Sequence, residues 1–174
     1  MNRKMIIALA VLLVAALGLS SCTTRDEAPI TPEYEQENMA PDFTVPLLTG
    51  ETFTLSEHRG TVVVLSFWAT WCGPCVAKMP TTQALWEQHG GDVIFVGMNL
   101  GEDQSRVQDF IDERGFTFPI ALDENADIHR TLYPAAGIPY TVVIGKDGTI
   151  IGDFLGGGTA SIEGIEAAIA EALR

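Results

Sequence analysis

Apolar residues form two nearly continuous runs in the middle of the chain, at residues 62–68 and 93–98. Runs of this kind are typical of central strands that are covered on both faces. Elsewhere the apolar residues recur at helical spacing, which predicts helices over residues 74–88 and 105–114. A last helix is predicted from a single apolar face made of Ile162, Ile165, Ile169 and Leu173.

Turn residues divide the remaining segments into hairpins and short elements. Thr49-Gly50 and Lys146-Asp147-Gly148 are turn sequences flanked by strand-like segments. The predicted hairpins pair residues 43–48 with 51–55 and residues 140–144 with 149–154, and a short strand and a short helix are predicted at 118–122 and 126–133. Strands alternate with helices early and a hairpin closes the sheet late, which indicates an α/β fold with a central mixed sheet flanked by helices.

The first 21 residues have the pattern of an export signal. Arg3 and Lys4 precede an apolar run at residues 5–19, which at 15 residues is shorter than the roughly 20 that span a bilayer. The sequence Leu19-Ser20-Ser21-Cys22 resembles a bacterial lipobox. We interpret residues 1–21 as a lipoprotein signal peptide and Cys22 as the lipidated residue. An ordinary cleaved signal and an uncleaved anchor are the alternatives.

Composition separates a tether from a single domain. Residues 22–38 are polar, acidic and proline-containing, which predicts a flexible tether, and residues 39–174 are long enough for one domain with its own core. The chain carries a net charge of −13, and without residues 1–21 its 8 basic and 23 acidic residues give −15. Nucleic-acid binding needs clustered Lys and Arg, so this negative charge excludes it. The charge also disfavours binding to anionic lipid headgroups, so we expect the lipid on Cys22 to be the membrane attachment.

The chemistry of the chain is concentrated in Trp71-Cys72-Gly73-Pro74-Cys75, at a predicted strand-to-helix junction. If Cys22 is lipidated, Cys72 and Cys75 are the remaining thiols. A disulfide between them closes so small a loop that it removes little entropy from the unfolded chain, so reactivity explains the pair better than stabilisation. Zinc would need two further ligands, and the sequence has no second CxxC or paired His. We interpret His58, His89 and His129 as surface residues.

Several segments together resemble one family. The string Phe67-Trp68-Ala69-Thr70-Trp71-Cys72-Gly73-Pro74-Cys75, followed by Met79-Pro80, resembles the active-site segment of thioredoxin-like proteins of the TlpA/ResA type. Residues 40–43 and 55–56 resemble the family's N-terminal extension, and residues 137–141 and 145–148 its cis-proline loop and hairpin. The resemblance implies a thioredoxin-like fold with an N-terminal β-hairpin extension and a helix and strand inserted at residues 101–120.

The family also implies a function. We expect an extracytoplasmic, lipid-anchored thiol-disulfide oxidoreductase of a bacterial membrane that reduces disulfides of client proteins, such as apocytochrome c. The resemblance implies a monomer without cofactor or metal, with a membrane thiol-reductant conductor as electron donor. Gly73-Pro74 is the dipeptide of thioredoxin, whose potential near −270 mV is that of a reductant. A peroxiredoxin-like peroxide reductase and a redox-inactive surface binding module are the alternatives.

We expect Cys72 to be the nucleophile and Cys75 the resolving thiol. Cys72 precedes a helix, where unpaired N–H groups and the helix dipole favour a thiolate. The resemblance implies a substrate-docking surface that contains Trp71, Gly73, Pro74, Ile138 and Pro139, with Ile138-Pro139 in the cis form. The alternatives are a trans turn at Pro139 and simple packing for Trp71.

The chain departs from the family at three positions. Ser66 stands where thioredoxin carries a buried acid, and Lys78 stands where the TlpA/ResA type commonly carries one. We interpret Lys78 as a solvent-facing residue, with electrostatic support of a thiolate as the alternative, and name Glu102 or a water chain as proton acceptors for Cys75. Tyr140 replaces a small polar residue, which predicts a narrower choice of clients.

Overall fold

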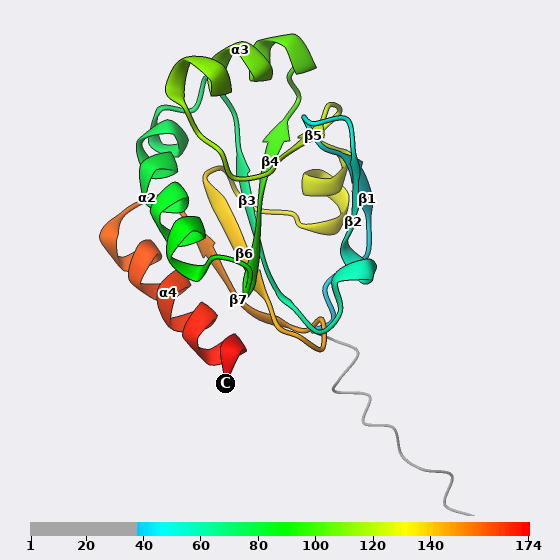
Figure 1. Ribbon diagram of the computed structural model, residues 1–174, viewed down its shortest axis with the longest axis vertical. Coiled ribbons are helices and arrows are strands. Elements are labelled where there is room, and N and C mark those ends of the chain that lie inside the picture. Colours follow the sequence, from blue (N-terminus) through cyan, green and yellow to red (C-terminus); the bar gives the residue numbers. More distant parts are fainter. Residues whose placement is uncertain (1–37) are drawn as a thin grey trace, which may run out of the picture. The chain divides into compact units, whose positions relative to one another are not determined.

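The computed structural model describes residues 38–174 (Figure 1). The interpretations of residues 1–21, of Cys22 and of nearly all of the tether therefore lie outside the described residues. The strands are β1 (Thr44–Pro46), β2 (Thr52–Thr54), β3 (Val62–Trp68), β4 (Val93–Leu100), β5 (Ile120–Asp123), β6 (Tyr140–Ile144) and β7 (Ile150–Leu155). The helical segments are η2 (Leu55–His58), α2 (Gly73–His89), α3 (Gln104–Arg114), η3 (Ile128–Leu132) and α4 (Thr159–Leu173).

The central sheet is mixed, as predicted. Its strand order is β5-β4-β3-β6-β7. Strands β3, β4 and β5 are parallel neighbours, and β6 pairs antiparallel with both β3 and β7. The β1–β2 hairpin forms a separate antiparallel pair. Each predicted strand and helix is present, with ends that differ by a few residues.

Helices α2 and α4 cover one face of the sheet (Figure 1). Leu85 of α2 and Ile165 and Ile169 of α4 are buried in one cluster with Val64 and Phe95 of the sheet. The apolar spacing of the last helix therefore marks the face that it buries.

The β1–β2 hairpin and the segment around η3 cover the other face (Figure 1). Val45, Phe53 and Tyr133 are buried in a second cluster with Leu65 and Phe67 of β3. All seven residues of β3 are buried because the strand is covered on both sides, which explains its apolar run.

The inserted helix α3 ends at Gly115, as predicted. Gly115 adopts the left-handed conformation with φ 72°, and its N–H donates to the Ile111 carbonyl oxygen, which ends the helix. Val107 and Ile111 pack in a third cluster with Trp68, Cys72 and Cys75. The inserted helix is thus part of the core around the two cysteines.

Helix α2 begins directly after the central strand. The Cys72 N–H donates to the Ala69 carbonyl oxygen at 3.1 Å, which closes the turn between β3 and α2. From Gly73 the helix continues through Pro80 to His89. Because β3 lies in the middle of the sheet, this connection places the CxxC motif at the end of the central strand.

Candidate active site

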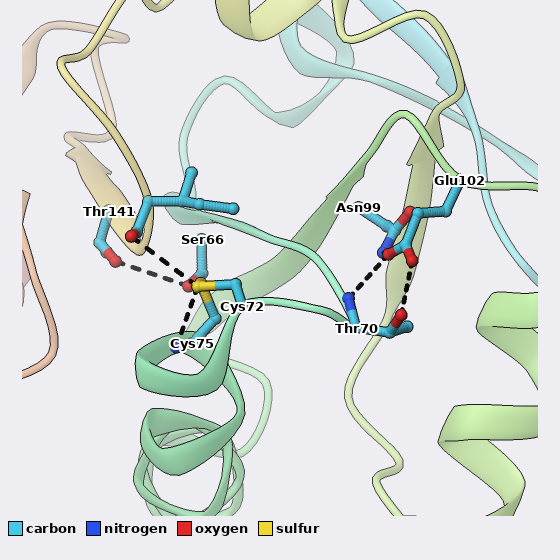
Figure 2. The surroundings of a disulfide bond; sticks show 8 residues. Ser66, Thr70, Cys72, Cys75, Asn99, Glu102 and Thr141 are labelled. Atoms are coloured by element: carbon cyan, nitrogen blue, oxygen red, sulfur yellow. Dashed lines mark hydrogen bonds between the residues drawn. A yellow bond between two sulfur atoms is a disulfide. The ribbon is translucent and has the colours of Figure 1, made fainter.

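Cys72 and Cys75 form a disulfide at the start of α2 (Figure 2). The S–S distance is 2.02 Å and the Cα–Cα distance is 5.2 Å. Cys72 is 6% exposed and Cys75 is 2% exposed. Both cysteines are therefore nearly closed to solvent in the disulfide form, and their roles as nucleophile and resolving thiol stay predictions.

The backbone around Cys72 favours a negatively charged sulfur. Cys72 is the N-cap of α2, and its Sγ accepts the Cys75 N–H at 3.2 Å (Figure 2). In the reduced protein the same N–H and the positive end of the helix dipole stabilise a thiolate. The Ile138 carbonyl oxygen lies 3.8 Å from this sulfur on the opposite side of the site.

The predicted docking residues differ in exposure. The Trp71 side chain is 66% exposed, and Gly73 and Pro74 are also exposed. The Ile138-Pro139 peptide bond is cis, as the resemblance implies, with Ile138 half-buried and Pro139 buried. Simple packing therefore does not account for Trp71, whose ring lies mostly in solvent beside the disulfide.

Sequence reasoning did not identify Leu155. This residue at the end of β7 is 55% exposed and lies opposite Tyr140 in the β6–β7 register. The next residue, Gly156, donates its N–H to the Pro139 carbonyl oxygen at 2.7 Å, which holds the end of β7 beside the cis-proline loop. The pairing of two strands brings Leu155 here, and no local motif signals it.

The interpretation of Lys78 as a solvent-facing residue is wrong. Lys78 is 5% exposed, and its Nζ donates a hydrogen bond to Thr141 Oγ1. The Ser66 and Thr141 hydroxyl oxygens lie 3.5 Å apart, on residues paired across β3 and β6 (Figure 2). Burial lowers the pKa of Lys78 to about 8.

Glu102 holds the loop that leads to the disulfide. Its carboxylate accepts the Thr70 N–H at 2.7 Å, the Thr70 hydroxyl at 2.5 Å and an Asn99 amide N–H at 2.8 Å (Figure 2). Arg106 Nε lies 3.0 Å from the same carboxylate. Burial alone would raise the pKa of Glu102, but these hydrogen bonds and the charge of Arg106 lower it. Because the Glu102 carboxylate binds the Thr70 backbone and hydroxyl, it positions the loop between β3 and α2.

Side-chain packing adds detail at the three histidines and at Tyr140. The histidines are half-buried, and His129 packs edge-on against the Phe67 ring at 5.2 Å between centroids. Burial is the main reason that the pKa of His129 is lowered. The Tyr140 ring stacks on Phe67 at 5.9 Å and packs against the cluster below the β1–β2 hairpin, and its effect on the choice of clients stays a prediction.

Residues 38–174 contain no group of three or more His, Cys, Asp or Glu side chains placed to hold a metal ion. Within the same residues, none of the helices is both long and apolar enough to cross a membrane. The chemistry that the geometry supports is the opening and closing of the Cys72–Cys75 disulfide.

Comparison with known proteins agrees with this geometry. Thiol-disulfide oxidoreductase ResA of Geobacillus kaustophilus is 36% identical over 114 residues, which are 64% of this chain and 64% of that protein. The chain thus spans just under two thirds of the length of this relative. Thioredoxin-like protein YneN of Bacillus subtilis is 32% identical over 136 residues, 75% of this chain and 79% of that protein.

The fold is also found among solved structures. The solution structure of a candidate protein disulfide isomerase from Bacteroides thetaiotaomicron superposes with a TM-score of 0.72 at 35% identity, covering 78% of this chain and 88% of that one. The Redoxin family model matches residues 35–169, a range that holds both cysteines, the cis-proline loop and most of α4. Because one match spans the whole site and its supporting sheet, the chain belongs to the redoxin family, among its thioredoxin-like members of the TlpA/ResA type.

Proposed function

We propose that the protein is a thiol-disulfide oxidoreductase that reduces disulfides of client proteins through Cys72 and Cys75. The observation that carries the proposal is the buried Cys72–Cys75 disulfide at the N-terminus of α2, where Cys72 Sγ accepts a backbone N–H. In this arrangement the thiolate form of Cys72 is more stable than the thiolate form of an isolated cysteine.

The reaction follows from the geometry in two steps. The Cys72 thiolate attacks one sulfur of a client disulfide and forms a mixed disulfide, and the other client sulfur leaves as a thiolate. Cys75, one helical turn further in, then attacks Cys72 Sγ. The Cys72–Cys75 bond forms, the bond to the client breaks, and two electrons have passed to the client.

The direction of electron flow is tested by the redox potential. Gly73-Pro74 separates the cysteines, as in thioredoxin. The reduction potential of thioredoxin lies near −270 mV, whereas that of the oxidant DsbA lies near −120 mV. We expect a value in the reducing range when the dithiol is equilibrated with glutathione buffers and the two states are quantified by thiol alkylation. A value above about −180 mV would overturn the assignment as a reductant.

Client recognition is assigned to the surface around the disulfide. Trp71, Gly73 and Pro74 expose apolar and small groups on one side, and Ile138 and Pro139 lie on the other.

Trapping with Cys75→Ser in the native host should leave clients, with apocytochrome c as one candidate, disulfide-linked to Cys72. Peroxide consumption without any such client would favour the peroxide-reductase alternative, and normal function of Cys72→Ser would favour a binding module.

We further propose that the protein acts outside the cytoplasm as a monomer, attached to a bacterial membrane through Cys22. The support is the sequence of residues 1–38, in which a lipobox-like segment precedes an acidic tether. Electrons would come from a membrane thiol-reductant conductor. Cys22→Ser should release the protein from the membrane fraction. Retention of that variant on membranes would contradict the lipid anchor.

A further inference from the structure

Lys78 is a buried cation without a carboxylate partner among the described residues. Lysine is rarely buried unless it is paired, because desolvation of an ammonium group costs several kcal/mol. The ion pairs within residues 38–174 join Arg106 to Glu102 and Arg130 to Asp127, and neither involves Lys78. The fold therefore keeps a costly group in its interior, on the helix that carries both cysteines.

Helix α2 places Lys78 on the same face as Cys75. The buried residues of α2 are Cys75, Lys78, Met79, Thr82 and Leu85, at spacings of three, four, seven and ten from Cys75. Side chains three residues apart on a helix have Cβ atoms about 5–6 Å apart, and they lean toward the helix N-terminus. Lys78 therefore starts one helical turn after Cys75 on the same buried face of α2.

The amine ends at a pair of hydroxyl groups behind the disulfide. Its hydrogen-bond acceptor is Thr141 Oγ1, which lies 3.5 Å from Ser66 Oγ, and both residues belong to the surroundings of the disulfide drawn in Figure 2. Each hydroxyl can donate one proton and accept another. Lys78, Thr141 and Ser66 are thus a connected set of groups that can hold and pass a proton.

The surroundings of the amine are uncharged, and the side chain is almost closed to solvent. A cavity of about 10 Å³, near the size of one water, adjoins Lys78. A Cβ built on Gly157, in the segment before α4, would lie 3.4 Å from Lys78 Cβ, so this segment covers the lysine stem. The other residues that line the cavity carry no charge: they are Val64, Ser66, Thr81, Thr82, Leu85, Phe95, Thr141, Ile162 and Ile165.

We propose that Lys78 is the proton acceptor for Cys75 in the step that resolves the mixed disulfide, acting through Thr141 and Ser66. The inference rests on the proposed dithiol exchange. The neutral amine takes the proton of the Cys75 thiol and becomes an ammonium. The Cys75 thiolate attacks Cys72 Sγ, the Cys72–Cys75 bond forms, and the Cys72–client bond breaks. The client sulfur leaves as a thiolate with the electron pair of that bond, and Lys78 later returns its proton to solvent.

The acid–base properties of the two groups suit this transfer. Burial lowers the pKa of Lys78 to about 8, so about one amine in ten is neutral at pH 7. The pKa of a free thiol is about 8.5, so a neutral amine with a pKa of about 8 can accept a proton from a thiol of ordinary acidity. The other residues that line the cavity beside this amine come from α2, β3, β4, β6 and α4, and none of them carries a charged side chain.

The test isolates the resolving step. The reduced chain is loaded at Cys72 with the thionitrobenzoate group of Ellman's reagent, and release of that coloured thiolate by Cys75 is followed from pH 5.5 to 10.5. We expect the wild-type release rate to rise with a midpoint near pH 8. In Lys78→Met we expect release to be at least tenfold slower at pH 7, with a midpoint at least one pH unit higher.

Two further variants separate proton transfer from other effects. Lys78→Arg keeps a positive charge but cannot give up a proton, so it should resolve as slowly at pH 7 as Lys78→Met. Lys146→Met removes an exposed lysine and should match the wild type. A wild-type release rate in Lys78→Met would overturn the proposal. A wild-type release rate in Lys78→Arg would also overturn it, because a fixed positive charge at residue 78 would then be sufficient and no proton transfer would be needed. A wild-type chain that releases nothing at any pH would instead overturn the proposed function.

Discussion

The burial of Lys78 predicts that its removal stabilises the oxidised protein at neutral pH. The folded pKa of about 8 lies about 2.5 units below the ordinary value of 10.5. One unit corresponds to 1.36 kcal/mol, so burial of the ammonium costs about 3 kcal/mol below pH 8. Lys78→Met removes this cost and loses the hydrogen bond to Thr141, which is worth about 1 kcal/mol. We expect a net gain of about 2 kcal/mol at pH 7.

The sign of this effect depends on pH. Between pH 8 and 10.5 the unfolded chain binds more protons at this position than the folded one, so the wild type gains stability as the pH rises through that window. Above pH 10.5 both states hold a neutral amine, and the advantage of Lys78→Met should disappear. The disulfide form is used because its cysteines do not titrate.

Urea unfolding at pH 7 and pH 10.5, followed by tryptophan fluorescence, measures both free energies. Lys146→Met is the matched control, because this exposed lysine should change stability by less than about 0.5 kcal/mol at either pH. A loss of stability in Lys78→Met at pH 7, or a difference that does not change with pH, would refute the reasoning that a charged amine is buried at a cost.

Three other perturbations test the packing, the loop and the docking surface. Gly97→Ala places a Cβ 2.8 Å from the Ile120 side chain, so we expect a loss of about 1–3 kcal/mol in urea unfolding, and unchanged stability would contradict the tight contact. Glu102→Gln weakens the hold on Thr70, so the Thr70 amide should exchange its hydrogen at least tenfold faster, and wild-type protection would remove Glu102 from loop positioning. Trp71→Ala should leave stability within about 0.5 kcal/mol but raise the KM for a protein disulfide several-fold, whereas an unchanged KM would exclude Trp71 from docking.

The sequence predicts most of the fold because its elements bury strongly patterned faces. The run at residues 62–68 is apolar throughout because both faces of β3 are covered, and the spacing of Ile165 and Ile169 marks the buried face of α4. The reactive pair is recognisable because only Gly73 and Pro74 separate Cys72 from Cys75 in one local motif. Patterns within one element are sufficient for these features.

The features that sequence reasoning missed depend on contacts between elements far apart in the chain. Lys78 looks like a surface lysine within α2, and only the covering segment at Gly157 and the hydroxyl of Thr141 on β6 make it a buried one. Leu155 reaches the site through the pairing of β7 with β6. The sequence alone offers Glu102 as a proton acceptor, but in the fold its carboxylate accepts the Thr70 N–H and so holds the loop before Cys72 in place.

The most direct test of the account follows the sulfur atoms through one turnover with insulin as the disulfide-containing protein. The reduced wild-type chain should cleave insulin disulfides and end with a Cys72–Cys75 bond, as mapped by mass spectrometry of alkylated peptides. Cys75→Ser should stop as a covalent adduct with insulin at Cys72, and Cys72→Ser should form no adduct. If the wild type keeps both thiols free and Cys75→Ser forms no adduct, the Cys72–Cys75 pair is not a dithiol that reduces proteins.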